Sequence, residues 1–209
     1  MQHGRFITIE GGEGTGKSTQ LSRLAARLQP LVGEVFITRE PGGSTGAEQI
    51  RNLLVNGPPE RWSAATETLL MYAARRDHIE RLIEPALKGG AYVICDRFHD
   101  STRAYQGAAG GASHALIEAL EHTVLEGLRP DLTLILDLAS DVGLARAKDR
   151  ADGEERFETK GREFHERLRE AFLHIAAREP DRCAVIDATG DADAVETRVW
   201  AAVSERLGL

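Results

Sequence analysis

A glycine-rich segment near the start of the chain has the residue types of a phosphate-binding loop. In "GGEGTGKST", residues 11–19, two glycines five positions apart are followed by lysine and serine. Glycines let successive backbone N–H groups converge on phosphate oxygens, and a helix that starts there adds its positive dipole end. Lys17 is expected to reach the β- and γ-phosphates of ATP, and Ser18 to offer a hydroxyl to Mg²⁺. The predicted ATP-binding residues are Gly11, Gly12, Glu13, Gly14, Thr15, Gly16, Lys17, Ser18 and Thr19.

A second polar cluster follows a later apolar run, in "CDRFHDSTRAYQG", residues 95–107. Asp96 can hold the water shell of a magnesium ion, and Arg97 is suited to clamp a phosphate with two parallel hydrogen bonds. Ser101, Tyr105 and Gln106 combine a hydroxyl, an aromatic ring and an amide, which suits a sugar and a base. The simpler alternative is a surface loop that only forms salt bridges.

Two further segments place arginines where they could join this cluster. Arg39 lies in "TREPGG", residues 38–43, at the end of a predicted strand, and is a candidate second phosphate clamp. Arg75 lies one helical turn after Met71 in "LLMYAARRDH", residues 69–78. Taken alone, the first arginine could be purely structural, and the second could be a surface charge on a helix with an apolar face.

The elements that must position these residues form an alternating pattern. Five short, nearly continuous apolar runs, typical of strands covered on both faces, lie at 5–10, 34–40, 91–96, 131–138 and 183–187. Between them, apolar residues recur at helical spacing, as in Leu21, Leu24 and Leu28, in Phe164, Leu168, Phe172 and Ile175, and in Val195, Val199, Val203 and Leu207. Such alternation predicts an α/β fold with a parallel sheet between two layers of helices. The candidate residues would then meet at the carboxyl ends of the strands.

Composition narrows the class of protein. The chain has 209 residues, enough for one domain spanning 1–209, and its formal net charge of -7 argues against general binding of nucleic acid. The beginning, "MQHGRFITIE", lacks the apolar stretch of a signal peptide, and no run is long enough to span a membrane. Cys95 and Cys183 are far apart and are expected to be core residues of a cytoplasmic protein.

The ordered set "EGGEGTGKST", "TREPGG", "YAARRDHI", "DRFHDSTRAYQG", "RPDLTLILDL" and "RFE" resembles the bacterial thymidylate kinase family over essentially the whole chain. The resemblance implies a P-loop NTPase fold, a three-layer α/β/α domain with a five-stranded parallel sheet and a mobile lid. It also implies a homodimer that uses Mg²⁺ and ATP to phosphorylate dTMP to dTDP, which feeds dTTP synthesis for DNA replication.

The resemblance also implies roles for the arginines and their neighbours. Arg39 and Arg97 match positions that approach the dTMP phosphate, Arg75 matches the arginine that reaches the thymine carbonyl, and Glu13 matches the acidic residue near the sugar and the metal. The segment that closes over base and deoxyribose corresponds to Ser101, Tyr105 and Gln106.

One position departs from the pattern of the family. Many members carry a phenylalanine that stacks on thymine four residues before the base-reading arginine, where this chain has Met71. Either Met71 packs on the base, or the neighbouring Tyr72 does so after a local shift.

A very polar segment at residues 146–162 is expected to form the lid. The loop residues between Gly12 and Thr15 include no basic side chain, and the resemblance then implies that lid arginines stabilise the migrating phosphoryl group. The candidates are Arg150 and Arg156, assisted by Arg146 or Lys148. The alternative is an exposed helix whose charges pair with each other.

A turn after the last strand, within 185–195, either lies near adenine or simply starts a helix.

Two other functions remain open at this point. The chain could be a kinase for another nucleoside monophosphate or for a deoxynucleoside. It could also be a P-loop switch or regulatory ATP-binding module, although it lacks the "NKxD" tetrapeptide that reads guanine in GTPases.

Overall fold

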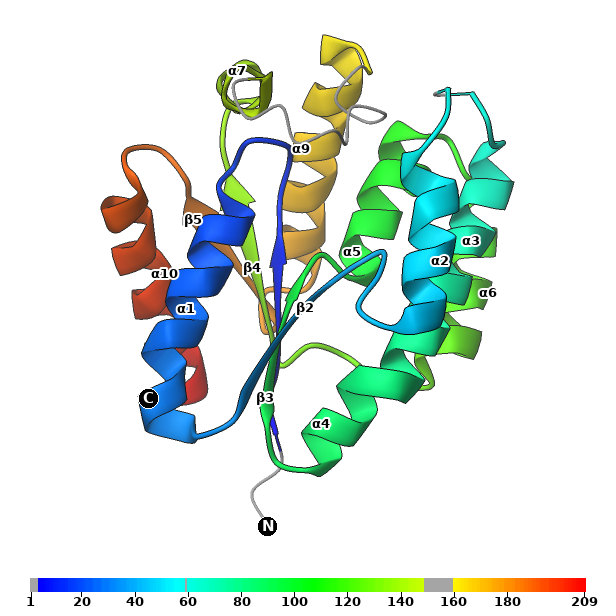
Figure 1. Cartoon of the computed structure of the whole chain (residues 1–209). Helices are drawn as coiled ribbons and strands as arrows, with labels where there is room; N and C mark the ends of the chain where they lie inside the picture. Colours follow the sequence, from blue (N-terminus) through cyan, green and yellow to red (C-terminus); the bar gives the residue numbers. More distant parts are fainter. Residues whose placement is uncertain (1–3, 59, 149–159) are drawn as a thin grey trace.

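All five predicted strands are present and form one parallel sheet (Figure 1). The computed structural model describes residues 4–58, 60–148 and 160–209. The strands are ordered β2-β3-β1-β4-β5 across the sheet, so the strand that precedes the glycine-rich loop is central. Their bounds are β1 Phe6–Glu10, β2 Val35–Arg39, β3 Tyr92–Asp96, β4 Leu132–Asp137 and β5 Cys183–Asp187.

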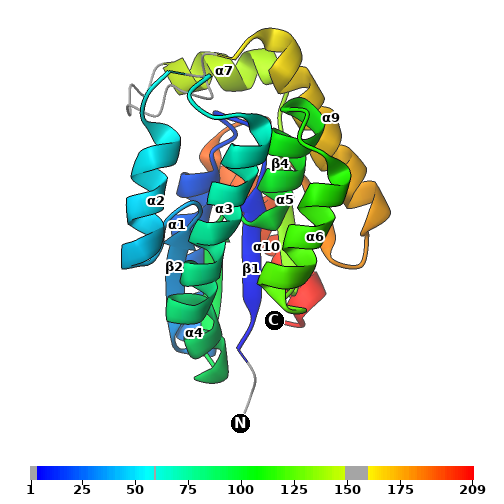
Figure 2. The same cartoon turned by 90° about the vertical axis from the view of Figure 1, so that its right-hand side faces the viewer.

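Helices cover both faces of the sheet, as the alternating pattern predicts (Figures 1 and 2). One face is covered by α1 (Lys17–Val32) and α10 (Ala192–Leu207). The other carries α3 (Ala64–His78), the π-helical turn η1 (Ile79–Ile83), α4 (Glu84–Lys88), α5 (His99–Thr102), the π-helical segment η2 (Arg103–Ala109), α6 (His114–Leu125) and α9 (Arg162–Arg178). None of the helices in the described part of the chain is long and apolar enough to cross a membrane.

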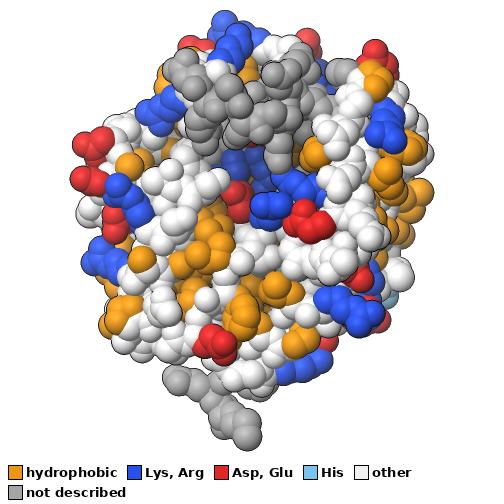
Figure 3. Space-filling view, in the orientation of Figure 1, with side chains coloured by type: hydrophobic (Ala, Val, Ile, Leu, Met, Phe, Trp, Pro, Cys, Tyr) orange, Lys and Arg blue, Asp and Glu red, His pale blue; other side chains and the backbone are white. Residues whose placement is uncertain are grey.

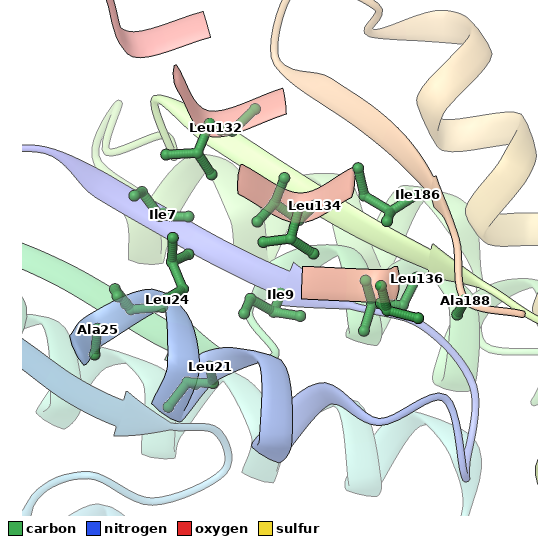
Figure 4. Close-up of a cluster of buried hydrophobic side chains, with 14 of the residues drawn as sticks. Ile7, Ile9, Leu21, Leu24, Ala25, Leu132, Leu134, Leu136, Ile186 and Ala188 are labelled. Atoms are coloured by element: carbon green, nitrogen blue, oxygen red, sulfur yellow. The ribbon is translucent and has the colours of Figure 1, made fainter. Parts of the chain in front are cut away.

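The buried side chains explain why the strands read as continuous apolar runs. Every residue of β1 is buried, because the strand is central and has helices above and below it. On the face of α1, the apolar stripe Leu21, Leu24 and Leu28 packs against Ile7 and Ile9 (Figure 4). At the sheet edges the pattern weakens, so that Ile37 of β2 is 52% exposed and Val185 of β5 is 48% exposed.

The strand register brings the polar motifs to one edge of the sheet. Asp96, the last residue of β3, is level with Ile9 of β1 and with Arg39 of β2. The glycine-rich loop, "TREPGG" and "DRFHDSTRAYQG" therefore leave the sheet side by side. Among the described residues, α2 (Thr45–Val55) and α7 (Ser140–Lys148) flank this edge, and α7 runs along its top in Figure 2.

Candidate active site

A cleft opens at the carboxyl edge of the sheet, and basic and acidic side chains gather around it in the upper half of the face in Figure 3. Its walls come from the glycine-rich loop and from the segments that follow β2 and β3, with additions from α2 and α3. The lining residues are Glu13, Gly14, Gly16, Lys17, Ser18, Arg39, Glu40, Pro41, Arg51, Val55, Met71, Arg75, Asp96, Arg97, Phe98, Ser101, Thr102, Tyr105 and Gln106. Motifs that are distant in sequence thus share one cavity.

The glycine-rich loop joins β1 to α1 and leaves the start of that helix open. Gly11, Gly14 and Gly16 have φ values of 136°, 68° and 90°, a region that residues with a side chain rarely adopt. No acidic residue lies in the first turn of α1, and no described side chain caps it. The N–H groups and the positive dipole end therefore stay available to an anion.

Lys17 is buried at the start of α1, with its ammonium group held over the loop. Its Nζ donates to the carbonyl oxygens of Gly12 at 2.8 Å and Gly11 at 3.3 Å. Burial and the charge of Arg97 lower the pKa of Lys17 to about 8, although nearby carboxylates oppose this shift. A phosphate on the loop would favour the charged form, because an anion stabilises a neighbouring ammonium group.

Arg97, directly after β3, has a backbone conformation that is costly for an arginine. Its φ is 70°, in the left-handed region, and such strain persists where the surroundings fix it. The next N–H group, that of Phe98, donates to the fully buried carboxylate of Glu10 at 2.7 Å. The side chain is thereby turned toward the loop, where Nη1 donates to the carbonyl oxygen of Gly11 at 2.8 Å. Lys17 and Arg97 thus approach the same oxygen atom.

Glu13 and Tyr105 complete a network around the guanidinium group of Arg97. Nη2 of Arg97 donates to Glu13 at 3.0 Å, Nη1 donates to Ser101 at 3.2 Å, and the Tyr105 hydroxyl donates to Glu13 at 2.6 Å. The guanidinium carbon also lies 4.8 Å from the centre of the Tyr105 ring. Burial alone would raise the pKa of Glu13, but the charges of Arg97 and Lys17 lower it to about 2. The carboxylate therefore stays ionised and acts as an acceptor.

Ser18 and Asp96 offer oxygen atoms of the kind that can hold a magnesium ion. The Ser18 hydroxyl lies 3.3 Å from Asp96 Oδ2, beside the open start of α1. Asp96 Oδ1 is buried and has no hydrogen-bond partner among the described residues. A carboxylate with one oxygen beside a hydroxyl and the other unpaired offers the hard oxygen donors that Mg²⁺ prefers when it also binds phosphates.

Arg75 lies deep in the cleft, so its interpretation as a surface charge is wrong. It is 2% exposed and forms a buried salt bridge in which Nε donates to Glu40 at 2.7 Å. Nη2 donates to the Thr102 hydroxyl at 3.1 Å. The pattern of α3 taken alone left a surface position open, because apolar spacing does not show that a carboxylate from another element meets this arginine.

The structure distinguishes Met71 from its neighbour. Met71 lines the cleft, whereas Tyr72 is 1% exposed, is not among the lining residues and places its ring 4.7 Å from the Arg75 guanidinium carbon. Gln106 also lines the cleft, and its Nε2 donates to the buried Glu67 at 2.8 Å. The inner end of the cleft thus combines an apolar side chain, a guanidinium group and an amide.

The mouth of the cleft carries two arginines, one of which the sequence analysis missed. Arg39 is 55% exposed in its side chain and pairs with Glu48 of α2 at 3.2 Å. Arg51, one helical turn further along α2, donates to the carbonyl oxygen of Pro41 at 2.5 Å and lines the cleft. Its position after "TREPGG" was the available signal, since a helix that follows such a turn must run past the same edge.

The predicted lid lies partly within the described residues. Arg146 and Lys148 are exposed on α7, and Arg146 donates to the carbonyl oxygen of Gly190 at 3.4 Å. Arg150 and Arg156 lie outside the described residues. The turn around Gly190 does start a helix, because the carboxylate of Asp191 caps α10.

A close backbone contact joins the glycine-rich loop to α7. A Cβ atom on Gly14 would lie 1.8 Å from the carbonyl oxygen of Gly143, and one on Gly143 would lie 2.4 Å from the carbonyl oxygen of Glu13. Both positions therefore require glycine. The contact fixes where the described base of the predicted lid stands relative to the phosphate-binding loop.

Comparisons with known proteins agree over nearly the whole chain. Residues 9–199 match the family model for thymidylate kinase. A thymidylate kinase from Caulobacter vibrioides is 63% identical over 209 residues and covers all of both chains. One from Afipia carboxidovorans is 55% identical over 206 residues, which is 98% of this chain and 90% of the relative.

A solved structure shares the architecture as well. The crystal structure of thymidylate kinase from Ehrlichia chaffeensis superposes with a TM-score of 0.79 at 35% sequence identity. The match covers 96% of this chain and 99% of the other. Fold and sequence therefore point to the same group of proteins.

Proposed function

The chain belongs to the thymidylate kinase family, and we propose that its cleft binds the phosphates of ATP on the glycine-rich loop and dTMP on the arginine side. The enzyme phosphorylates dTMP to dTDP with the γ-phosphate of ATP, on the path to dTTP. One observation supports the placement most strongly: Lys17 and Arg97 approach the same carbonyl oxygen, that of Gly11. A donor phosphate and an acceptor phosphate held by these two cations would meet there.

The donor end consists mainly of backbone groups. The N–H groups of the loop and of the first turn of α1 would bind the β- and γ-phosphates, with Lys17 adding a positive charge. Ser18 and Asp96 would hold Mg²⁺, which when bound offsets the charge of the phosphates. Because these groups are fixed before ATP arrives, little reorganisation is needed at the moment of transfer.

The acceptor end consists of side chains. Arg97, assisted by Arg39, would bind the phosphate of dTMP, and Glu13 would face the sugar together with Ser101 and Tyr105. The phosphate of dTMP is already anionic near neutral pH, so its oxygen can attack without a general base. The protein then acts mainly by positioning and by neutralising charge.

The base would occupy the inner end of the cleft. Arg75 and Gln106 would contact its polar edge, and Met71 would pack on its ring. We assign the packing role to Met71 rather than to Tyr72, because Met71 lines the cleft and Tyr72 lies behind it.

The remaining roles rest on the family. Arg150 and Arg156, assisted by Arg146 and Lys148, would close over the phosphates during transfer. A homodimer and a cytoplasmic location are likewise proposed, the latter in keeping with two free, buried cysteines. Analytical ultracentrifugation at micromolar concentration tests the dimer, and a purely monomeric profile would contradict it.

The central test compares variants at Arg97. Arg97→Ala should reduce kcat at saturating ATP and dTMP by roughly 100- to 1000-fold, because one charge-stabilising donor is lost. Arg97→Lys should recover only part of this, since an ammonium group cannot form two parallel hydrogen bonds. Arg167→Ala, which removes an exposed arginine paired with Glu163 on α9, is the matched control and should leave kcat unchanged.

A panel of acceptors tests the substrate. The wild-type enzyme should prefer dTMP to dUMP, dCMP, dGMP and AMP in a coupled ADP-release assay. A preference for a purine monophosphate would refute the assignment of the acceptor site. The alternative of a regulatory ATP-binding module predicts that no monophosphate stimulates ATP turnover.

A further inference from the structure

Two buried carboxylates hold the polar groups at the inner end of the cleft. Glu40 is 5% exposed and accepts from Arg75, while Glu67 is 6% exposed and accepts from Gln106. Glu67 is not among the residues that line the cleft. Because an ionised carboxylate can only accept hydrogen bonds, each of them determines which atoms its partner retains for a ligand.

The amide of Gln106 is oriented by this rule. Its Nε2 group donates to Glu67 Oε1 at 2.8 Å. An amide has two N–H donors on nitrogen and its acceptor on oxygen, so a carboxylate that accepts one N–H turns the nitrogen toward itself and the oxygen away. The carbonyl oxygen of Gln106 is therefore the acceptor that this side chain can offer to a molecule in the cleft.

The neighbouring Arg75 offers the opposite polarity. Its Nε and Nη2 atoms are used by Glu40 and Thr102, while its buried Nη1 has no hydrogen-bond partner among the described residues. A guanidinium group has only donors, so Nη1 can donate a hydrogen bond to an acceptor on a ligand.

Glu40, which pairs with Arg75, is itself held in place by further contacts. The second oxygen of Glu40 lies 2.9 Å from His78 Nδ1, and His78 Nε2 lies 2.7 Å from the Thr38 hydroxyl. Since the carboxylate accepts, Nδ1 donates to it, and the contact of Nε2 with Thr38 holds the other side of the ring. These contacts leave Glu40 little freedom to turn.

We propose that Glu67 is a positioning residue for base selection, which holds Gln106 with its acceptor toward the base beside the donor of Arg75. A donor next to an acceptor complements the 4-carbonyl group and the N3–H group of thymine. Cytosine presents the reverse order, with an amino group at C4 and an unprotonated N3. This inference rests on the proposed placement of the dTMP base at the inner end of the cleft.

Replacing Glu67 by glutamine tests whether an acceptor-only carboxylate orients Gln106, because the two side chains have nearly the same shape. A glutamine at this position can donate as well as accept, so the amide of Gln106 could turn over and present its NH₂ group to the cleft. The site would then tolerate N3 of cytosine better and N3–H of thymine less well.

The measurement is the ratio of kcat/KM for dTMP to kcat/KM for dCMP. Glu67→Gln should lower this ratio roughly tenfold or more, since a buried hydrogen-bond mismatch is exchanged for a match. Glu67→Asp, which keeps an acceptor-only group, should retain a higher ratio than Glu67→Gln. The matched control is Glu121→Gln, another buried carboxylate, which pairs with Arg103 and should leave the ratio unchanged even if stability falls.

The outcomes separate the possible failures. If Glu67→Gln lowers kcat/KM equally for both substrates, Glu67 is only structural and the inference is wrong. If that variant does not fold, Glu67→Met, which also removes the acceptor, gives the same ratio test.

Gln106→Leu separates the inference from the function on which it rests. A ratio unchanged in Gln106→Leu would refute the placement of the base. A ratio lowered in Gln106→Leu but not in Glu67→Gln or Glu67→Met would refute only the role of Glu67.

Discussion

The two ends of the cleft are built differently, and in the proposed function they would bind anions by different means. The loop end uses backbone N–H groups from one contiguous segment, with glycines at three positive φ angles and a single buried cation, Lys17. The arginine end uses side chains from β2, α3 and the segment after β3, and each one is held by a carboxylate. Arg97 contacts Glu13, Arg75 contacts Glu40, and Arg39 contacts Glu48.

This difference has an energetic reason. Backbone N–H groups at a helix start carry only partial charges and need no counter-charge. A buried guanidinium group carries a full charge, which is costly away from water unless an opposite charge accompanies it. The arginine end is therefore expected to respond more strongly in stability when a supporting carboxylate is lost, and the loop end mainly in catalysis.

The largest effect is expected for Glu40→Gln. This variant keeps the shape of the side chain but leaves the charge of the buried Arg75 without its counter-ion, which should lower the free energy of unfolding by about 3 to 5 kcal/mol. Urea denaturation monitored by circular dichroism measures it. Glu84→Gln removes an exposed (i, i+4) pair with Lys88 and should cost only about 0.5 kcal/mol. If Glu40→Gln and Glu84→Gln lost equal free energies of unfolding, the buried pair at the arginine end would not have the importance for stability that we assign to it.

Lys17→Met should show the opposite behaviour. Loss of the ammonium group over the loop should reduce kcat by roughly 100- to 1000-fold. The free energy of unfolding should change little, because burial already disfavours the charged form of Lys17. Steady-state kinetics and urea denaturation of the same preparation test both parts, with the exposed Lys88→Met as control. If Lys17→Met were strongly destabilised but kept a normal kcat, Lys17 would act in stability and not in catalysis, contrary to the difference drawn between the two ends.

The same difference explains how much could be predicted from the sequence. Contiguous patterns were sufficient for the five strands, the helices that flank them and the glycine-rich turn between β1 and α1, because each depends on neighbouring residues. Arg39, Arg75 and Arg97 were predicted as site residues, but the burial of Arg75 was not, since it depends on Glu40 from another element.

Glu10 and Glu67 were missed for a similar reason. Their partners, Ser101 and Gln106, are 91 and 39 residues away in the chain. Pairing over such separations leaves no periodic signal in a single sequence. A glutamate at the end of a buried strand, as in "FITIE", was the only hint for Glu10.

A pH titration sharpens the comparison at Glu13, where the two ends meet. Its pKa is lowered from 4.5 to about 2 in the folded protein. A depressed carboxyl pKa contributes stability above about 4.5, and this contribution is lost as the pH falls from 4.5 toward 2. The free energy of unfolding of the wild type should therefore exceed that of Glu13→Gln by about 1 to 2 kcal/mol at pH 6, and by less at pH 3.5. A difference independent of pH would show that Arg97 and Lys17 do not hold this carboxylate ionised.

The smallest effect is expected for Arg39→Ala, at the water-exposed mouth of the arginine end. Its pair with Glu48 is 55% and 41% exposed, and such pairs contribute only about 0 to 1 kcal/mol to stability. An exposed cation also attracts a phosphate weakly because water and salt screen its charge. We therefore expect KM for dTMP to rise by about two- to fivefold with kcat nearly unchanged, and the rise to shrink at high salt. A large fall in kcat would instead mean that Arg39 contacts the phosphate at the moment of transfer, as proposed for Arg97.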